Sequence, residues 1–76
     1  MMSDRTVHGM TQDGGQIVRY DRAGKWWIEY PPESLKPRRS VTLAGAVAEA
    51  RRGRAFLGRY GGRMFDAAYR KGQADE

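Results

Sequence analysis

The sequence predicts an α+β fold in which a small antiparallel sheet of three strands is covered by one or two C-terminal helices. Apolar and aromatic residues alternate with polar ones within residues 16–30, which is the period of two expected of strands with one buried face. A short β-branched segment follows at residues 38–42, and helical spacing of apolar residues begins directly after it. Because two strands alone are only marginally stable in water, the helices must cover their apolar face.

Length and composition limit the chain to one small domain. It has 76 residues and no cysteine, so disulfides cannot stabilise it. A domain of this size buries only about 60% of its unfolded surface, so stability requires a well-packed core or a homodimer. We expect residues 1–15 to be a flexible arm that can end in a short strand, residues 16–71 to be the domain, and residues 72–76 to be a frayed tail. No segment has the roughly 20 apolar residues of a membrane span or the apolar centre of a signal peptide, so we expect a cytoplasmic protein without a membrane partner.

Residues 16–30 have the pattern of a β-hairpin. Trp26 and Trp27 fall on opposite faces of its second strand, with Trp26 on the side expected to be buried. Trp27 is therefore a candidate exposed aromatic residue, and packing against the long helix is the alternative. Between the strands, Asp21 and Gly24 bound a four-residue turn, because aspartate caps turns and glycine accepts positive φ.

Residues 31–37 contain three prolines and must leave the sheet as a loop, because proline cannot donate to a strand ladder. Leu35 is the residue expected to anchor this loop to the core. Residues 38–42 follow as a short edge strand whose arginines discourage pairing with other chains. Thr42 then stands at the N-cap position of a helix over residues 43–51.

Residues 53–71 also have helical spacing, either as one helix or with a break at Gly61-Gly62. Wound as a helix, Arg59, Arg63 and Arg70 lie within about 20° of one direction. A straight stripe of arginines can follow a phosphate backbone, because the guanidinium group binds phosphate in a bidentate way. The alternative is an ordinary solvated helix face.

The pattern of residues 16–52 resembles the HicB-type antitoxin domain. The residues that carry the resemblance are Asp21, Gly24, Trp26, Ile28, Tyr30 and Pro31, followed by Thr42, Leu43, Ala44 and residues 46–50. The resemblance implies a β-β-β-α domain and an antitoxin-like protein that binds a partner protein. The same order of elements is similar to the arm-type DNA-binding domain of tyrosine recombinases, which implies DNA recognition by the sheet. From both we take an expectation about the fold only.

The net charge of +5 is concentrated in the second half of the chain. Residues 36–71 hold ten basic groups against the two acidic residues Glu49 and Asp66. Such segregation is the electrostatic footprint of a protein that binds nucleic acid or another anionic surface. An arginine-rich composition inherited from a GC-rich genome is the alternative.

We expect no enzyme, cofactor or metal site, because there is no cysteine, His8 is the only histidine, and the acidic residues show no catalytic spacing. The leading hypothesis is a small basic nucleic-acid-binding protein, regulatory or a phage-type accessory factor, with DNA favoured over RNA. The residues expected to contact phosphate are Arg59, Arg63 and Arg70, with Arg51, Arg52, Arg54, Arg38 and Arg39 beside them. The alternative is a protein–protein interaction module, as a homodimer or as an inhibitor of an acidic partner protein.

Overall fold

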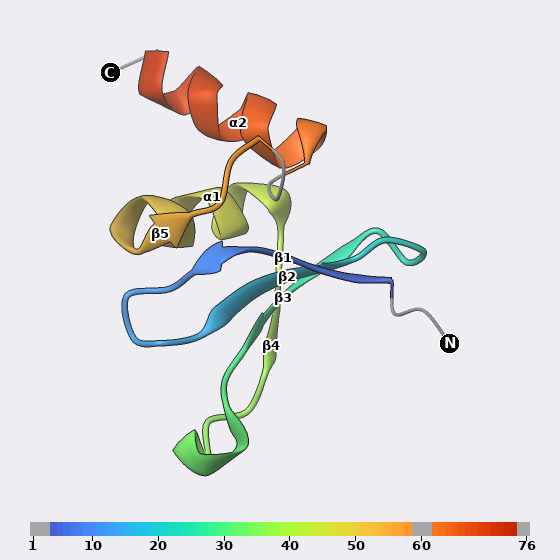
Figure 1. Cartoon of the computed structure of the whole chain (residues 1–76), viewed down its shortest axis with the longest axis vertical. Coiled ribbons are helices and arrows are strands. Elements are labelled where there is room, and N and C mark those ends of the chain that lie inside the picture. Colours follow the sequence, from blue (N-terminus) through green and yellow to red (C-terminus); the bar gives the residue numbers. More distant parts are fainter. Residues whose placement is uncertain (1–3, 59–61, 75–76) are drawn as a thin grey trace.

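The computed structural model describes residues 4–58 and 62–74, which form a twisted sheet with two helices on one side (Figure 1). The elements in chain order are β1 (Arg5–Met10), β2 (Gln16–Tyr20), β3 (Lys25–Glu29), the 3-10 helix η1 (Pro32–Ser34), β4 (Arg39–Val41), α1 (Leu43–Arg52), β5 (Arg54–Ala55) and α2 (Arg63–Ala74). The strand order is β4-β3-β2-β1-β5, and every neighbouring pair is antiparallel. The α+β class is confirmed, and the described part of the sheet has five strands where the sequence predicted three.

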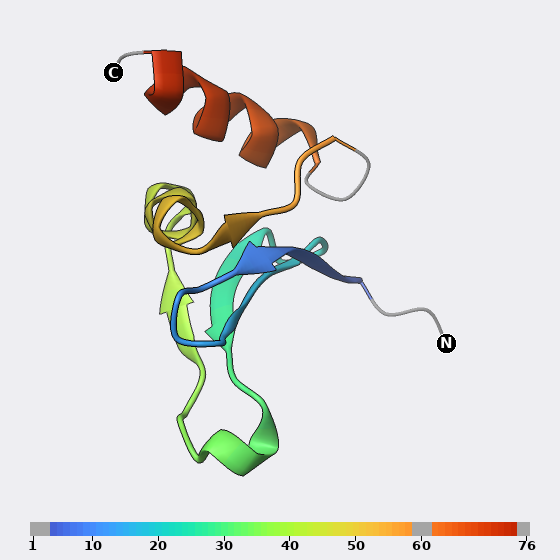
Figure 2. The same cartoon turned by 60° about the vertical axis from the view of Figure 1, so that its left-hand side comes forward.

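The core lies between the helix side of the sheet and the two helices. Ile17, Trp26 and Ile28 point from the sheet toward Ala46, Val47 and Ala50 of α1 and Phe65 of α2. Phe65 is fully buried, and its ring stacks on that of Trp26 with centroids 5.7 Å apart. Both helices therefore cover the same face, and the two views agree that no helix of the described residues covers the opposite face (Figures 1 and 2).

The two elements with the clearest local signals form as predicted. The β2–β3 hairpin turns at residues 21–24, where Gly24 has φ 65° and its N–H donates to the Tyr20 carbonyl at 2.8 Å. The Thr42 hydroxyl caps α1 by accepting from the Gly45 N–H at 3.0 Å. Both elements are specified by contacts between residues close in sequence, which is why the sequence pattern suffices for them.

Strand β1 lies in the segment that the sequence indicated as a flexible arm. It pairs with β2 over its whole length, with Val7 opposite Val18 and an irregularity between Val7 and Gly9. The β1–β2 turn closes through the Thr11 N–H, which donates to the Gly15 carbonyl at 2.8 Å. The sequence pattern did not indicate this strand because the segment is mostly polar. The strand is ordered by backbone pairing with β2 and not by the burial of alternating apolar side chains.

The segment after α1 differs from the expected helix. Gly53 ends α1, and β5 pairs with the end of β1, so residues 54–58 are not helical. A side chain at Gly9 would overlap the Arg54 carbonyl oxygen, and one at Gly53 would overlap the Met10 carbonyl oxygen. These two glycines let the chain pass close enough to β1 to add a fifth strand. Helix α2 begins directly after Gly62, which has φ 78°.

Candidate nucleic-acid interface

The face of the sheet turned away from the helices is its uncovered surface. Cross-strand partners share a face, so the register assigns the side chains to it. We call this surface the open face; its residues are Arg5, Val7, Met10, Gln16, Val18, Tyr20, Lys25, Trp27, Glu29, Ser40 and Arg54, together with Arg38, whose side chain covers Trp27. The structure therefore presents a broad sheet face of mixed aromatic and basic character.

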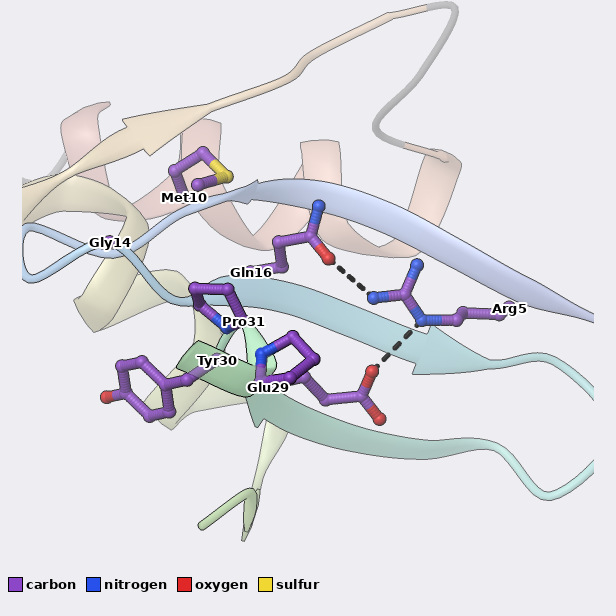
Figure 3. Close-up of a pocket in the computed structure, with 8 residues that line it drawn as sticks. Arg5, Met10, Gly14, Gln16, Glu29, Tyr30 and Pro31 are labelled. Atoms are coloured by element: carbon purple, nitrogen blue, oxygen red, sulfur yellow. Dashed lines mark hydrogen bonds and ion pairs between the residues drawn. The ribbon is translucent and has the colours of Figure 1, made fainter. Parts of the chain in front are cut away.

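Glu29 is the centre of the polar part of the open face (Figure 3). Its carboxylate accepts from Arg5 Nε at 3.0 Å and from the Tyr20 hydroxyl at 2.5 Å. Arg38 Nη1 lies 3.6 Å from the same carboxylate. Arg5 Nη2 also donates to Gln16 Oε1 at 2.6 Å, which orients the Gln16 amide. Side chains from β1, β2 and β3 are thus joined into one network.

This network shifts the ionisation of its members. Burial raises the pKa of the Glu29 carboxyl, but the hydrogen bonds from Tyr20 and Arg5 outweigh that effect and hold the pKa below its ordinary value. The hydrogen bond to Glu29 raises the pKa of the Tyr20 hydroxyl. Glu29 is therefore a carboxylate and Tyr20 a neutral donor at neutral pH, so the network keeps its charges fixed.

An apolar row crosses the open face beside this network. Val18, opposite Val7 and Trp27, has an exposed fraction of 0% although no helix covers it. Trp27 is half-buried, and the Arg38 guanidinium lies 4.3 Å from the centroid of its ring. The prediction that Trp26 and Trp27 occupy opposite faces is confirmed, and Trp27 lies on the open face, away from both helices.

The charge of the open face is strongly positive. Arg5, Lys25, Arg38 and Arg54 are basic, and Glu29 is its only acidic residue. Arg5 and Arg38 are paired with Glu29, whereas Lys25 and Arg54 have no ion pair in the part of the chain that the structure describes. The phosphate contacts expected from the sequence included Arg38 and Arg54 but not Arg5 and Lys25, which the strand register places on the same face.

A shallow pocket of about 340 Å³ opens on this face at the end of β3 (Figure 3). Its polar lining comes from Arg5, Gln16 and Glu29, and its apolar lining includes Met10 and the first prolines of the β3–β4 loop. Hydrogen-bonding groups and apolar side chains in one concavity suit a planar polar ligand such as a nucleobase.

The arginine stripe expected on the last helix is present in part. Arg63 and Arg70 are exposed on α2, and neither has an ion pair within residues 4–58 and 62–74. They stand about 10 Å apart along the helix axis. Arg59, the third member, lies outside the described residues. Arg63 and Arg70 form a basic surface on the helix side of the protein, separate from the open face.

The remaining predicted arginines are engaged in contacts within the protein. Arg51 donates from Nη2 to the Tyr69 carbonyl at 3.1 Å and lies over the Tyr69 ring. Arg52 and Arg39 both pair with the Glu49 carboxylate. Arg51 thus joins α1 to α2 and Arg39 joins β4 to α1, whereas the Arg52 pair lies within α1, so Arg51 and Arg39 hold elements together in addition to any contact with a ligand.

Other kinds of site find little support in the described residues. No group of three or more His, Cys, Asp or Glu side chains among them could hold a metal ion. His8 is buried against the rings of Trp26 and Phe65, with centroids 4.6 and 5.2 Å away. No helix in the described ranges is long and apolar enough to cross a membrane.

Comparison of the chain with protein-family models, curated proteins and solved structures found no match. The resemblances to the HicB-type domain and to the recombinase arm domain therefore stay expectations from the sequence pattern, and the site is interpreted from its own geometry.

Proposed function

We propose that this protein binds nucleic acid without catalysing a reaction, and that the open face of its sheet is the contact surface. The observation that supports this most directly is the composition of that face: four basic side chains and two aromatic ones share it with a single carboxylate, and no helix of the described residues covers it. Basic groups bind phosphates, and aromatic rings offer surfaces on which bases can stack.

The network around Glu29 suits this role because it holds the contact groups in place before a ligand arrives. Arg5 is held by Glu29 and Gln16, and Arg38 is held between Glu29 and the Trp27 ring. An arginine that is already ordered loses less conformational entropy on binding than a free one. Lys25 and Arg54, which have no such partner among the described residues, supply charge toward two edges of the surface.

Salt dependence gives a quantitative expectation. If the four basic residues of the open face each neutralise one phosphate of a duplex, log Kd should depend on log salt with a slope near 3.6, about 0.9 for each phosphate. Affinity should then fall by roughly a hundredfold between about 50 and 200 mM salt. An apolar protein interface barely responds to salt, so this measurement separates nucleic-acid binding from the alternative of an acidic or apolar protein partner.

The test uses fluorescence anisotropy with a labelled random duplex and a labelled single strand. Two double variants are compared with the wild type: Lys25→Ala with Arg54→Ala on the open face, and Arg63→Ala with Arg70→Ala on α2. Each removes two positive charges, so they are matched in net charge, and none of the four residues has an ion pair in the described part of the chain. Both variants should fold like the wild type.

We expect the open-face variant to bind more weakly than the wild type. The slope of its log Kd against log salt should be smaller by about 1.8, which corresponds to the loss of two phosphate contacts. The α2 variant should lose less. A larger loss of affinity in the α2 variant would show that Arg63 and Arg70, and not the open face, form the contact surface. No binding to either probe at about 50 mM salt would refute nucleic-acid binding and leave an acidic protein partner as the alternative.

A further inference from the structure

The connection between β3 and β4 projects from the side of the sheet opposite the helices (Figures 1 and 2). It comprises residues 31–37 and contains η1 and all three prolines of the chain. Every residue in it is exposed. We call this segment the β3–β4 lobe. It lies at the end of β3, next to the pocket of the open face, whose lining includes Pro31 and Pro32.

Leu35 is held outward in this lobe by an unusual backbone conformation. Its side chain is 91% exposed, so it does not anchor the loop to the core as the sequence indicated. Its φ of 61° and ψ of 7° place it in the left-handed region, where it is the one residue other than glycine with positive φ in the described chain. L-residues with a large side chain are disfavoured there, and such backbone outliers cluster at functional sites.

The lobe is braced, so Leu35 is presented on a firm support. The Leu35 N–H donates to the Pro32 carbonyl at 3.3 Å, and the Ser34 hydroxyl donates to the Pro31 carbonyl at 2.8 Å. The Lys36 N–H donates to the Ser34 hydroxyl at 3.2 Å. The Lys36 ammonium group pairs with Asp13 at 3.3 Å, which ties the lobe to the β1–β2 turn. These contacts fix the backbone of the lobe, so the exposed Leu35 side chain is presented in a defined place before a ligand binds.

The charges around Leu35 indicate the chemistry of its partner. Lys36 and Arg38 follow it within three positions, and Glu33 is the single acidic residue of the lobe. Each of the two cations has one carboxylate partner, Asp13 or Glu29, yet keeps more than half of its side chain exposed. An apolar tip flanked by basic side chains is complementary to a polyanion with an apolar interior. A nucleic-acid duplex has this character, because its stacked bases lie between two rows of phosphates.

We propose that Leu35 is an apolar wedge that inserts between adjacent base pairs of a duplex in the minor groove and bends it. This inference rests on the proposed function and deepens it by naming double-stranded nucleic acid as the ligand. Leucine is one of the side chains that architectural proteins use as wedges, and insertion kinks the duplex by roughly 20–90°. Lys36 and Arg38, whose side chains are more than half exposed beside their carboxylate partners, contact the phosphates on either side of the inserted side chain.

The experiment measures affinity by anisotropy, and bending by energy transfer between dyes at the two ends of a duplex of about 30 base pairs. The proteins are the wild type, Leu35→Asn and Leu35→Met. Asparagine is tolerated in the left-handed region, so Leu35→Asn should raise the melting temperature by about 2–5 °C. The same change should weaken duplex binding by roughly tenfold to a hundredfold and leave the duplex straight. Leu35→Met keeps an apolar side chain and should bind and bend like the wild type.

The outcomes separate the two proposals. Binding by the wild type with no change in end-to-end distance, or equal bending by Leu35→Asn, overturns the wedge and leaves nucleic-acid binding standing. No binding of any probe by the wild type overturns both proposals. Weaker binding and lost bending in Leu35→Asn, in a variant that melts higher than the wild type, supports the wedge because impaired folding cannot explain it.

Discussion

The guanidinium group of Arg51 on α1 occupies the space that a side chain at Gly72 of α2 would need. From there Arg51 donates to the Tyr69 carbonyl at 3.1 Å and lies 5.6 Å from the centroid of the Tyr69 ring. Glycine late in a helix is unfavourable by itself. Here the absence of a side chain at Gly72 leaves room for Arg51, whose contacts with Tyr69 join α1 to α2.

This relationship predicts a double-mutant cycle with a clear sign. Gly72→Ala should gain about 1 kcal/mol of helix propensity and lose about 0.5–1.5 kcal/mol as Arg51 is displaced from its hydrogen bond, so alone it should change stability little. In an Arg51→Ala background only the gain remains, and Gly72→Ala should stabilise by about 1 kcal/mol. Urea denaturation of the four proteins measures the coupling. Equal effects in both backgrounds would show that Arg51 and Gly72 are independent.

The contact between β1 and β5 predicts a strong effect at Gly9. A Cβ at this position would overlap the backbone carbonyl of Arg54, which cannot move without separating the strands. Gly9→Ala should therefore destabilise by about 2–3 kcal/mol or more. Gly14→Ala is the control, because Gly14 has φ 92° and no atom within 4 Å of its Cβ position, so only about 1 kcal/mol of backbone strain is expected. Similar losses in both variants would contradict the close strand contact.

The lowered pKa of the Asp13 carboxyl group predicts that the stability of the fold depends on pH. A hydrogen bond from Thr11, with further ones from Tyr30 and Lys36, lowers the pKa of Asp13 from 3.8 to about 2. Because the folded-state pKa is depressed, the carboxylate contributes its full stability above the unfolded pKa of roughly 4, and the contribution is lost as the pH falls to about 2. Urea midpoints of the wild type and Asp13→Asn should thus differ at pH 7 and converge toward pH 2. A gap that stays constant over this range would show that the pKa is not depressed.

Glu29 predicts opposite changes in stability and binding. Glu29→Gln removes the acceptor charge for Arg5, Tyr20 and Arg38, which should reduce stability by about 1–3 kcal/mol. If the open face binds nucleic acid, the same change removes its single negative charge and should raise affinity several-fold at low salt. Thermal melting and anisotropy on one protein preparation measure both. Lower affinity in a variant that is still folded would contradict this prediction and show that the ordering of Arg5 and Arg38 by Glu29 outweighs the effect of its charge.

The fold could be predicted from the sequence where neighbouring residues specify it. The β2–β3 hairpin needs the alternation around Trp26 and the turn at Gly24, and α1 needs the cap at Thr42; all of these signals lie within a few residues. Strands β1 and β5 could not be predicted in this way. Strand β1 is mostly polar and is ordered by backbone pairing with β2. The β1–β5 pairing depends on backbone contacts of Gly9 with residues more than forty positions away, and glycines that permit close approach look the same in sequence as glycines in loops.

In the candidate site, too, some features follow from the sequence of each segment and others depend on contacts between distant segments. The basic character of the chain, the two-sided placement of Trp26 and Trp27 and the exposure of Arg63 and Arg70 follow from composition and periodicity, so the sequence alone determined them. Tertiary structure decided that Arg5 joins Glu29 across 24 residues, and that Leu35 points away from the core. The physical reason is that strand register and loop geometry are set by the whole sheet, whereas hydrophobic periodicity is a property of each segment.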